Sequence, residues 1–298
     1  MNSHVKRNWS HYNKSLVNRG SLNIWIDEAF QKQWFKKKNT PGRPAFSTHV
    51  IELGWILKIV YRLTLRAMQG FLQSILGLLK LDLDSPHYSL FSKRAKEASD
   101  AAKKLSNRKP IDLVIDASGI KVYGEGEWKV KIHGKSKRRK WLKLHLGMDP
   151  ESQEVISFEV TESNKADSEM LPDIMNKAPK SIKRVVADGA YDRKKCREYL
   201  EKHKITAHIP PSISSQCKPG EEERNKNIQI MKGLGGGQDG KRLWKKLTGY
   251  HIRSLVETVF SRYKMLFGDR FKSRKFVNQI CEAKMSLYVL NRMIRLSM

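Results

Sequence analysis

The chain has 298 residues, of which 58 are lysine or arginine and 30 are aspartate or glutamate, so its formal net charge is +28. Hydrophobic residues make up 39%, enough for a buried core, and the length suggests about two domains. No apolar run approaches the roughly 18 residues of a membrane span, and the first residues lack the apolar stretch of a secretory signal. We therefore expect a cytoplasmic protein without a membrane partner.

The basic excess indicates a polyanionic partner, because each lysine or arginine placed on a phosphate releases condensed counterions. A merely soluble basic surface is the alternative that composition leaves open. The three cysteines, Cys196, Cys217 and Cys281, lie far apart and form no C-x-x-C pair. This spacing disfavours a disulfide framework and a structural zinc site, and it points to a reducing compartment.

Residues 1–106 are expected to be helical. Apolar spacing and capping residues predict helices over 22–30, from Ser47 or Thr48 to about 61, and from Thr64 to about 80. A further basic helix starts at Ser85-Pro86 and carries Lys93 and Arg94 on its polar sides. Short helices ending in a basic one fit a helix-turn-helix relative, whose last helix enters the major groove. They fit an ordinary helical bundle with a solvated basic face equally well.

Residues 107–298 change to an α/β texture. Buried-strand and alternating patterns predict five strands over 111–116, 141–148, 154–160, 182–187 and 205–209. Helices are expected after Asp167, over 191–202, over about 250–267 and over about 276–296. The order of elements predicts a mixed sheet with flanking helices. A polar, glycine-rich stretch at about 210–245 is expected to be a short flexible insertion without phosphate-loop spacing.

Two aspartates stand where apolar strands are expected to end. Asp116 follows 111–115 and Asp188 follows 182–187, positions from which a rigid backbone can present a side chain to a cleft. Aspartate is also a common turn former, and Asp149 before Pro150 is better explained in that way. Asp112 and Asp192 lie close to these two aspartates in the sequence. On strand position alone they are alternative candidates for the same role.

The helix expected over 250–267 carries polar residues on one stripe. At about 100° per residue, Tyr250, Arg253, Glu257 and Lys264 fall within roughly 60°, and an apolar stripe lies on the opposite side. The residues alone favour a solvated face, with Arg253 and Glu257 paired four residues apart. The competing hypothesis is a functional stripe that combines one acid, two bases and a phenol.

The spacing Tyr250-x2-Arg253-x3-Glu257-x6-Lys264 resembles the Y-R-E-K signature of bacterial insertion-sequence transposases of the DDE type. Further segments resemble the IS-five-like branch: Leu113 to Asp116, Gly124 to Lys129, Ala187 to Asp192, Gly42 to Pro44 and Tyr88 to Arg94. The resemblance covers nearly the whole chain. It implies a ribonuclease-H-like catalytic domain over 107–298, preceded by an all-helical, helix-turn-helix-like DNA-binding region over 1–106.

The resemblance also implies the chemistry. Asp116, Asp188 and Glu257 would be the catalytic, metal-binding triad for two Mg²⁺ ions, with Mn²⁺ able to substitute. Tyr250, Arg253 and Lys264 would contact the transposon-end DNA. Water would free a 3′-OH at the terminal inverted repeat, and that 3′-OH would join target DNA by transesterification without a nucleotide cofactor. A homodimer on paired ends and a nucleoid-associated location follow from the same resemblance.

Other basic and aromatic residues are candidate DNA contacts. Trp244 could stack on a flipped base or simply pack at the entry of the helix. The basic segment 129–143, with Lys137, Arg138 and Arg139, has the density of an arm that tracks the DNA backbone, or it is a solvated loop. His133 and His145 lack metal-ligand spacing and are expected to be structural or phosphate contacts.

Two other functions stay open on the sequence. One is a catalytically silent, transposase-derived DNA-binding regulator or architectural protein. The other is a related resolvase or repair nuclease, which would cut branched or damaged DNA without joining strands.

The charge predicts that binding to duplex DNA weakens steeply with salt. Between about 50 and 200 mM salt the affinity should fall by about a thousandfold or more, because counterions released on binding are regained at high salt. Fluorescence anisotropy with a labelled duplex measures this slope. A flat salt response would contradict the assignment of the basic excess to DNA phosphates.

Overall fold

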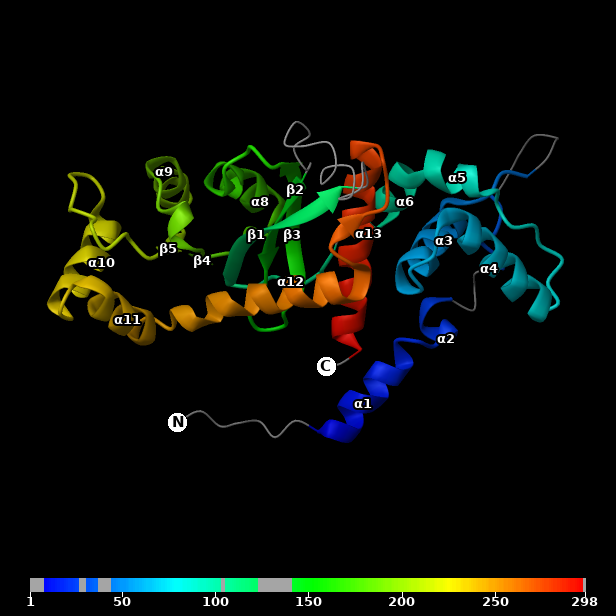
Figure 1. Cartoon of the computed structure of the whole chain (residues 1–298), viewed down its shortest axis with the longest axis horizontal. Coiled ribbons are helices and arrows are strands. Elements are labelled where there is room, and N and C mark those ends of the chain that lie inside the picture. Colours follow the sequence, from blue (N-terminus) through cyan, green and yellow to red (C-terminus); the bar gives the residue numbers. More distant parts are fainter. Residues whose placement is uncertain (1–7, 27–30, 37–43, 103–104, 123–140, 297–298) are drawn as a thin grey trace, which may run out of the picture. The chain divides into compact units, whose positions relative to one another are not determined.

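The computed structural model describes residues 8–26, 31–36, 44–102, 105–122 and 141–296. The chain divides into two compact units, one formed by residues 106–264 and the other by residues 1–105 together with 265–298 (Figure 1). Residues 265–298 are expected from the sequence to belong to the catalytic domain, whereas their contacts group them with the N-terminal unit. The function assigned to each expected domain stays a prediction.

The N-terminal unit is built mainly from helices. Their bounds are α1 (Trp9–Asn18), α2 (Leu22–Trp25), α3 (Thr48–Val60), α4 (Leu65–Leu78), α5 (Tyr88–Lys93), α6 (Ala95–Ala101) and α13 (Phe276–Arg295), and the short strand β6 is Arg270–Phe271. Two predicted caps are confirmed: Ser47 Oγ accepts from the amide of Val50 at 3.3 Å, and Thr64 Oγ1 accepts from the amide of Ala67 at 3.3 Å.

The core of this unit forms around α3, which buries residues on nearly all of its sides. Trp55 of α3 donates its indole N–H to the carbonyl oxygen of Phe91 at 3.1 Å, which fixes α5 against α3. Met285, Val289 and Met293 of α13 belong to the same apolar cluster. The last helix therefore completes the hydrophobic core that the N-terminal helices begin.

The second unit contains a mixed sheet. Within its described residues the strands are β1 (Asp112–Val122), β2 (Trp141–Met148), β3 (Val155–Glu162), β4 (Arg184–Val186) and β5 (Thr206–His208), in the order β3-β2-β1-β4-β5. β1 pairs antiparallel with β2, and β2 with β3, whereas β4 pairs parallel with β1 and with β5. The predicted mixed α/β sheet is confirmed, and its arrangement fits a ribonuclease-H-like domain.

Helices and helical turns accompany the sheet. Their bounds are η2 (Asp167–Met170), α8 (Leu171–Lys177), η3 (Gly189–Tyr191), α9 (Lys194–Lys202), α10 (Glu222–Gly233), α11 (Gly237–Leu247), η4 (Tyr250–Arg253) and α12 (Ser254–Phe267). Leu171 and Ile174 of α8 and Leu200 of α9 pack with β1 residues in one apolar cluster. None of the helices that the structure describes is long and apolar enough to cross a bilayer.

The expected flexible insertion at 210–245 is wrong in its main part. The segment forms α10 and α11, the yellow helices of Figure 1, joined at a glycine corner. Gly235, Gly236 and Gly237 all have positive φ, which glycine adopts without steric cost. A Cβ on Gly240 would lie 2.2 Å from the carbonyl oxygen of Met231, so α11 packs directly on the end of α10. The glycines therefore serve a tight helical corner.

We predict that Gly54→Ala destabilises the protein by about 1–3 kcal/mol, because overpacking a filled core forces side chains to move. A Cβ at this position would lie 2.2 Å from the buried Phe91 ring. Gly70→Ala in α4 is the matched control, since nothing lies within 4 Å of its Cβ, and it should stabilise by about 0.5–1 kcal/mol. Urea unfolding of both variants measures the difference. Equal effects would contradict the close α3–α5 packing.

Candidate active site

Asp116 and Asp188 lie near each other, Asp116 within β1 and Asp188 just beyond the end of the neighbouring strand β4. The parallel register aligns Val114 of β1 with Val186 of β4, and the two aspartates each follow two residues later. Because side chains alternate along extended chain, both carboxylates belong on the same face. One expectation is corrected: β1 continues to Val122, so Asp116 lies within a strand rather than at its end. Asp188 does follow the end of β4.

Asp116 is nearly buried, with a side chain that is 13% exposed. The amide of Ala117 donates to its Oδ1 at 2.9 Å, and Arg253 Nη2 donates to its Oδ2 at 2.9 Å. Burial raises the pKa of Asp116, the Ala117 and Arg253 contacts lower it, and the Asp188 and Glu257 charges raise it further. Asp188 and Glu257, the other two acids of the expected triad, therefore both lie within electrostatic reach of Asp116.

Arg253 joins two of these acids. While Nη2 binds Asp116, Nη1 donates to Glu257 Oε1, four residues further along the chain. The Glu257 side chain is 58% exposed, in contrast to that of Asp116. Arg253 Nε is buried and has no hydrogen-bond partner within the described part of the chain. The guanidinium thus bridges two carboxylates and retains one unused donor.

Lys264 lies on the same stripe and also contacts β1. Its Nζ donates to Ser118 Oγ at 2.7 Å, and Ser118 follows Asp116 by two residues on the same strand face. The predicted Arg253–Glu257 pair is therefore confirmed, whereas the solvated face is wrong for Arg253 and Lys264, because each also bonds to a side chain of β1. Local pattern could not reveal this, because both partners lie more than 130 residues earlier in the chain.

Asp188 keeps an open carboxylate. One oxygen, Oδ1, accepts from the amide of Ala190 at 2.9 Å and caps the turn η3. Among the described residues it takes part in no ion pair. Its side chain is therefore placed by a backbone contact while most of its acceptor capacity stays available.

Tyr250 is buried and bonds inward. Its hydroxyl donates to the carbonyl oxygen of Ala187 at 3.1 Å, directly before Asp188. Burial raises the pKa of Tyr250 to about 12. The hydroxyl expected to contact DNA is thus engaged within the protein, where it ties η4 to the chain that carries Asp188.

Trp244 is fully buried, which agrees with the packing explanation and not with a base-stacking platform. Its indole N–H donates to Asn227 Oδ1 at 3.1 Å, and its ring lies 5.4 Å from that of His208 and 5.8 Å from that of Tyr250. In this conformation Trp244 fastens α11 to α10, β5 and η4.

The competing acids are used elsewhere. Asp112 accepts from Arg184 Nε at 2.9 Å. Asp149 closes the predicted turn, accepting from the amide of Glu151 at 3.0 Å. Asp192 pairs with Arg197 of α9 and with Arg224 of α10. Each of these acids has a structural partner of its own, and none of them pairs with the Arg253 guanidinium that joins Asp116 to Glu257.

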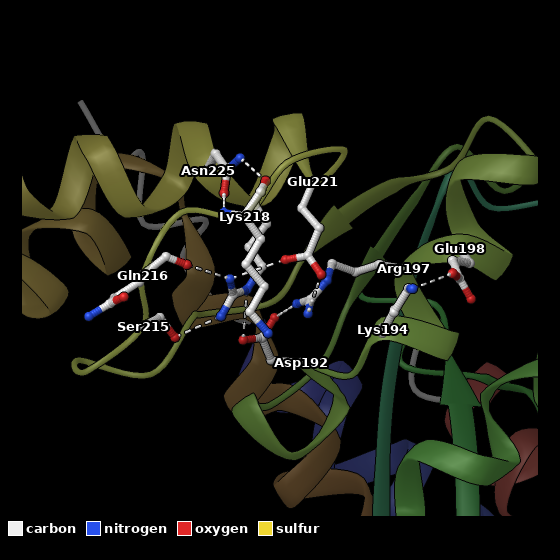
Figure 2. A network of polar contacts seen from close by, with 10 residues as sticks. Asp192, Lys194, Arg197, Glu198, Ser215, Gln216, Lys218, Glu221 and Asn225 are labelled. Carbon is white, nitrogen blue, oxygen red and sulfur yellow. Dashed lines mark hydrogen bonds and ion pairs between the residues drawn. The ribbon is translucent and has the colours of Figure 1, made fainter.

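The Asp192 contacts belong to a larger ionic network (Figure 2). Arg197 and Arg224 both also pair with Glu221, at 3.5 and 3.2 Å, so two arginines and two acids alternate. Arg224 further donates to Ser215 Oγ at 2.8 Å. The network connects α9 with the start of α10 and lies beside a cavity of about 750 Å³. It fixes the helical insertion to the sheet domain.

The other predicted DNA contacts and the two histidines lie in different surroundings. Lys93 is exposed at the end of α5. Arg94 instead binds Glu97 at 2.6 Å and the Phe46 carbonyl oxygen at 2.8 Å, between α5 and α6, which were expected to be one helix. Lys137, Arg138, Arg139 and His133 lie outside the described residues. His145 is buried and bonded to Thr161, and burial lowers its pKa to about 4, in agreement with a structural role.

Sequence reasoning missed two polar groups beside the acids. Ser118 binds Lys264. Because the strand continues beyond Asp116, Ser118, two residues later, lies on the same face of the strand, and this spacing could have identified it. The Tyr191 hydroxyl is buried without a hydrogen-bond partner among the described residues. Burial raises the pKa of Tyr191, and the charges of Asp167, Asp116 and Asp188 raise it further. Only the fold brings that hydroxyl near the acids.

The acids fit a divalent cation in kind. Asp116, Asp188 and Glu257 offer only oxygen atoms, the ligands that Mg²⁺ prefers. In this conformation, however, no three histidine, cysteine, aspartate or glutamate side chains of the described residues converge closely enough to hold an ion. The Arg253 guanidinium occupies the position between two of the acids instead.

The mixed sheet and its adjoining carboxylates define a ribonuclease-H-like domain with an acidic centre. A family model described as a transposase DDE domain matches residues 107–292, and a second model of the same description matches residues 17–125. The chain belongs to the DDE transposase family. This confirms the DDE part of the resemblance, whereas the IS-five-like branch and the Y-R-E-K signature stay predictions.

We predict that Asp192→Asn lowers the free energy of unfolding by about 1–3 kcal/mol, because two nearly buried guanidiniums lose a charged hydrogen-bond partner. The Asp192 side chain is 10% exposed. Asp239→Asn is the control, since Asp239 also pairs with an arginine but is largely exposed, and it should change stability little. Thermal unfolding compares them. A fully stable Asp192→Asn would return Asp192 to the candidates for the active site.

Proposed function

We propose that the protein is a DNA transposase whose catalytic centre consists of Asp116, Asp188 and Glu257. One observation carries the proposal: Arg253 binds both Asp116 and Glu257. The parallel pairing of β1 with β4, which Asp188 follows, supports it. The family match supplies the reaction class. Acids alone would fit many hydrolases, but acids flanked by Arg253 and Lys264 suit a phosphodiester substrate.

The three carboxylates would hold two Mg²⁺ ions, or Mn²⁺ in their place, which would activate the attacking oxygen and stabilise the leaving one. In the first step a water oxygen forms a bond to phosphorus, and the bond to the 3′ oxygen of the transposon end breaks. In the second step that 3′-OH attacks a target phosphodiester and displaces another 3′ oxygen. The number of phosphodiester bonds is unchanged in the joining step, so no nucleotide cofactor is needed.

The basic side chains take separate parts in this proposal. Arg253 offers a planar fork that matches phosphate oxygens, and Lys264 a single mobile charge. Tyr250 acts from inside, through the Ala187 carbonyl oxygen, to hold the segment that carries Asp188. The terminal inverted repeats would be bound by the N-terminal helices, with Lys93 exposed, and by Lys137, Arg138 and Arg139. A homodimer on paired ends is part of the same proposal.

We predict that Asp116→Asn, Asp188→Asn and Glu257→Gln each abolish Mn²⁺-dependent nicking of a supercoiled plasmid that carries the element's ends. Binding to those ends should stay within a few-fold of the wild-type affinity, because the net charge changes by one unit only. Glu198→Gln is the matched control for Glu257→Gln. Glu198 also pairs with a cation four residues earlier and is 59% exposed, so its variant should nick normally.

Retained nicking in any of the three variants would remove that residue from the triad. A wild-type protein that binds the ends but never nicks DNA would indicate the catalytically silent regulator. Cutting of branched DNA without strand joining would indicate a resolvase or repair nuclease.

A further inference from the structure

The Arg253 guanidinium lies where a metal ion would have to displace it. Its Nη2 binds Asp116 at 2.9 Å and its Nη1 binds Glu257, so one cation neutralises two members of the proposed triad. Both contacts use carboxylate oxygens that a divalent cation would need as ligands. A guanidinium and a metal ion therefore compete for the same oxygen lone pairs.

The Arg253 guanidinium carries a permanent charge, so it does not leave the acids as a neutral group. It can leave only by moving to another anion. The two contacts differ in how much water screens them: the Asp116 carboxylate is 13% exposed and the Glu257 carboxylate 58%. The Glu257 contact is therefore the weaker one, and the arginine is held mainly through Asp116.

The same guanidinium is not fully satisfied where it lies. Its Nε is buried without a hydrogen-bond partner in the described part of the chain. An unpaired buried donor destabilises the arrangement that contains it. A phosphodiester presents two oxygens that share one negative charge, and the paired donors of an arginine fork can bind both oxygens at once. DNA phosphate is thus an anion that could draw Arg253 away from the acids.

We infer that Arg253 is a latch on the acidic centre: in the DNA-free protein it occupies Asp116 and Glu257 and weakens metal binding, and a DNA phosphate releases it. This inference rests on the proposed function, since it takes the three acids as metal ligands. By thermodynamic linkage, DNA and metal then strengthen each other's binding by the same factor. The transposase would acquire its metal chiefly on DNA.

The test is a calorimetric titration of Mn²⁺ into the full-length, DNA-free protein. Arg253→Gln should bind Mn²⁺ at least about fivefold more tightly than the wild type, the lower end of usual coupling between sites. Arg262→Gln is the matched control: it removes an equal charge from α12, the helix that follows η4, but Arg262 binds Gln153 at 2.6 Å instead of an acid. Its Mn²⁺ affinity should stay near that of the wild type.

Equal or weaker Mn²⁺ binding by Arg253→Gln would overturn the latch, because Arg253 would then merely position the carboxylates. The same holds if neither protein binds Mn²⁺. Arg253→Lys, which keeps the charge but loses the fork, should give an intermediate affinity, and it decides the question alone if Arg253→Gln does not fold by circular dichroism.

A second arm separates this inference from the proposed function. Asp116→Asn combined with Arg253→Gln should lose the tight Mn²⁺ site. If it does not, Asp116 is no metal ligand and the proposed triad fails. If the site is lost while Arg253→Gln alone gives no gain over the wild type, only the latch fails. Adding a duplex oligonucleotide should strengthen Mn²⁺ binding in the wild type more than in Arg253→Gln, and an equal effect would contradict release by DNA.

Discussion

The ion pair between Arg253 and Asp116 is the contact on which the acidic centre depends. It connects residues that are 137 positions apart in the chain, and through the second arm of Arg253 it extends to Glu257. Together with the Lys264–Ser118 hydrogen bond, it joins the segment that carries Glu257 to the strand that carries Asp116. Because two other acids lie within electrostatic reach of Asp116, their repulsion of its charge must also be offset, and the guanidinium does this in the DNA-free protein.

The rest of the second unit holds that contact in place. The parallel pairing of β1 and β4 sets Asp116 beside Asp188. Tyr250 attaches η4 to the Ala187 carbonyl oxygen, and the buried Trp244 attaches α11 to the same region. Directly after η3, Asp192 pairs with Arg197 and Arg224, and these ion pairs fix the start of α10. Buried aromatic packing and paired charges thus fix α10 and α11 in place, and with them the segment that carries Arg253.

The sequence predicted what local pattern controls. Strand periodicity located the central strands, and the caps at Ser47 and Thr64 were correct because capping involves neighbouring residues only. Asp188 was placed correctly after its strand. The glycine run at 235–237 misled the prediction, because glycine marks a tight corner between packed helices as readily as a loop.

The missed features all depend on distant partners. The contact of Arg253 with Asp116 and that of Arg94 with the Phe46 carbonyl oxygen are set by tertiary packing. So is the length of β1 beyond Asp116, which the antiparallel pairing with β2 stabilises. Family resemblance could name the functional residues, but it could not say which partners they have in the DNA-free protein.

The central claim is that Arg253 and Asp116 are bonded to each other before DNA or metal arrives. A double-mutant cycle tests it most directly, with the free energy of unfolding measured in metal-free buffer for the wild type, Asp116→Asn, Arg253→Gln and the double variant. We expect a coupling energy of about 1 kcal/mol or more, since residues in one ion-pair network interact by about 0.5–3 kcal/mol. Strictly additive single effects would contradict the account.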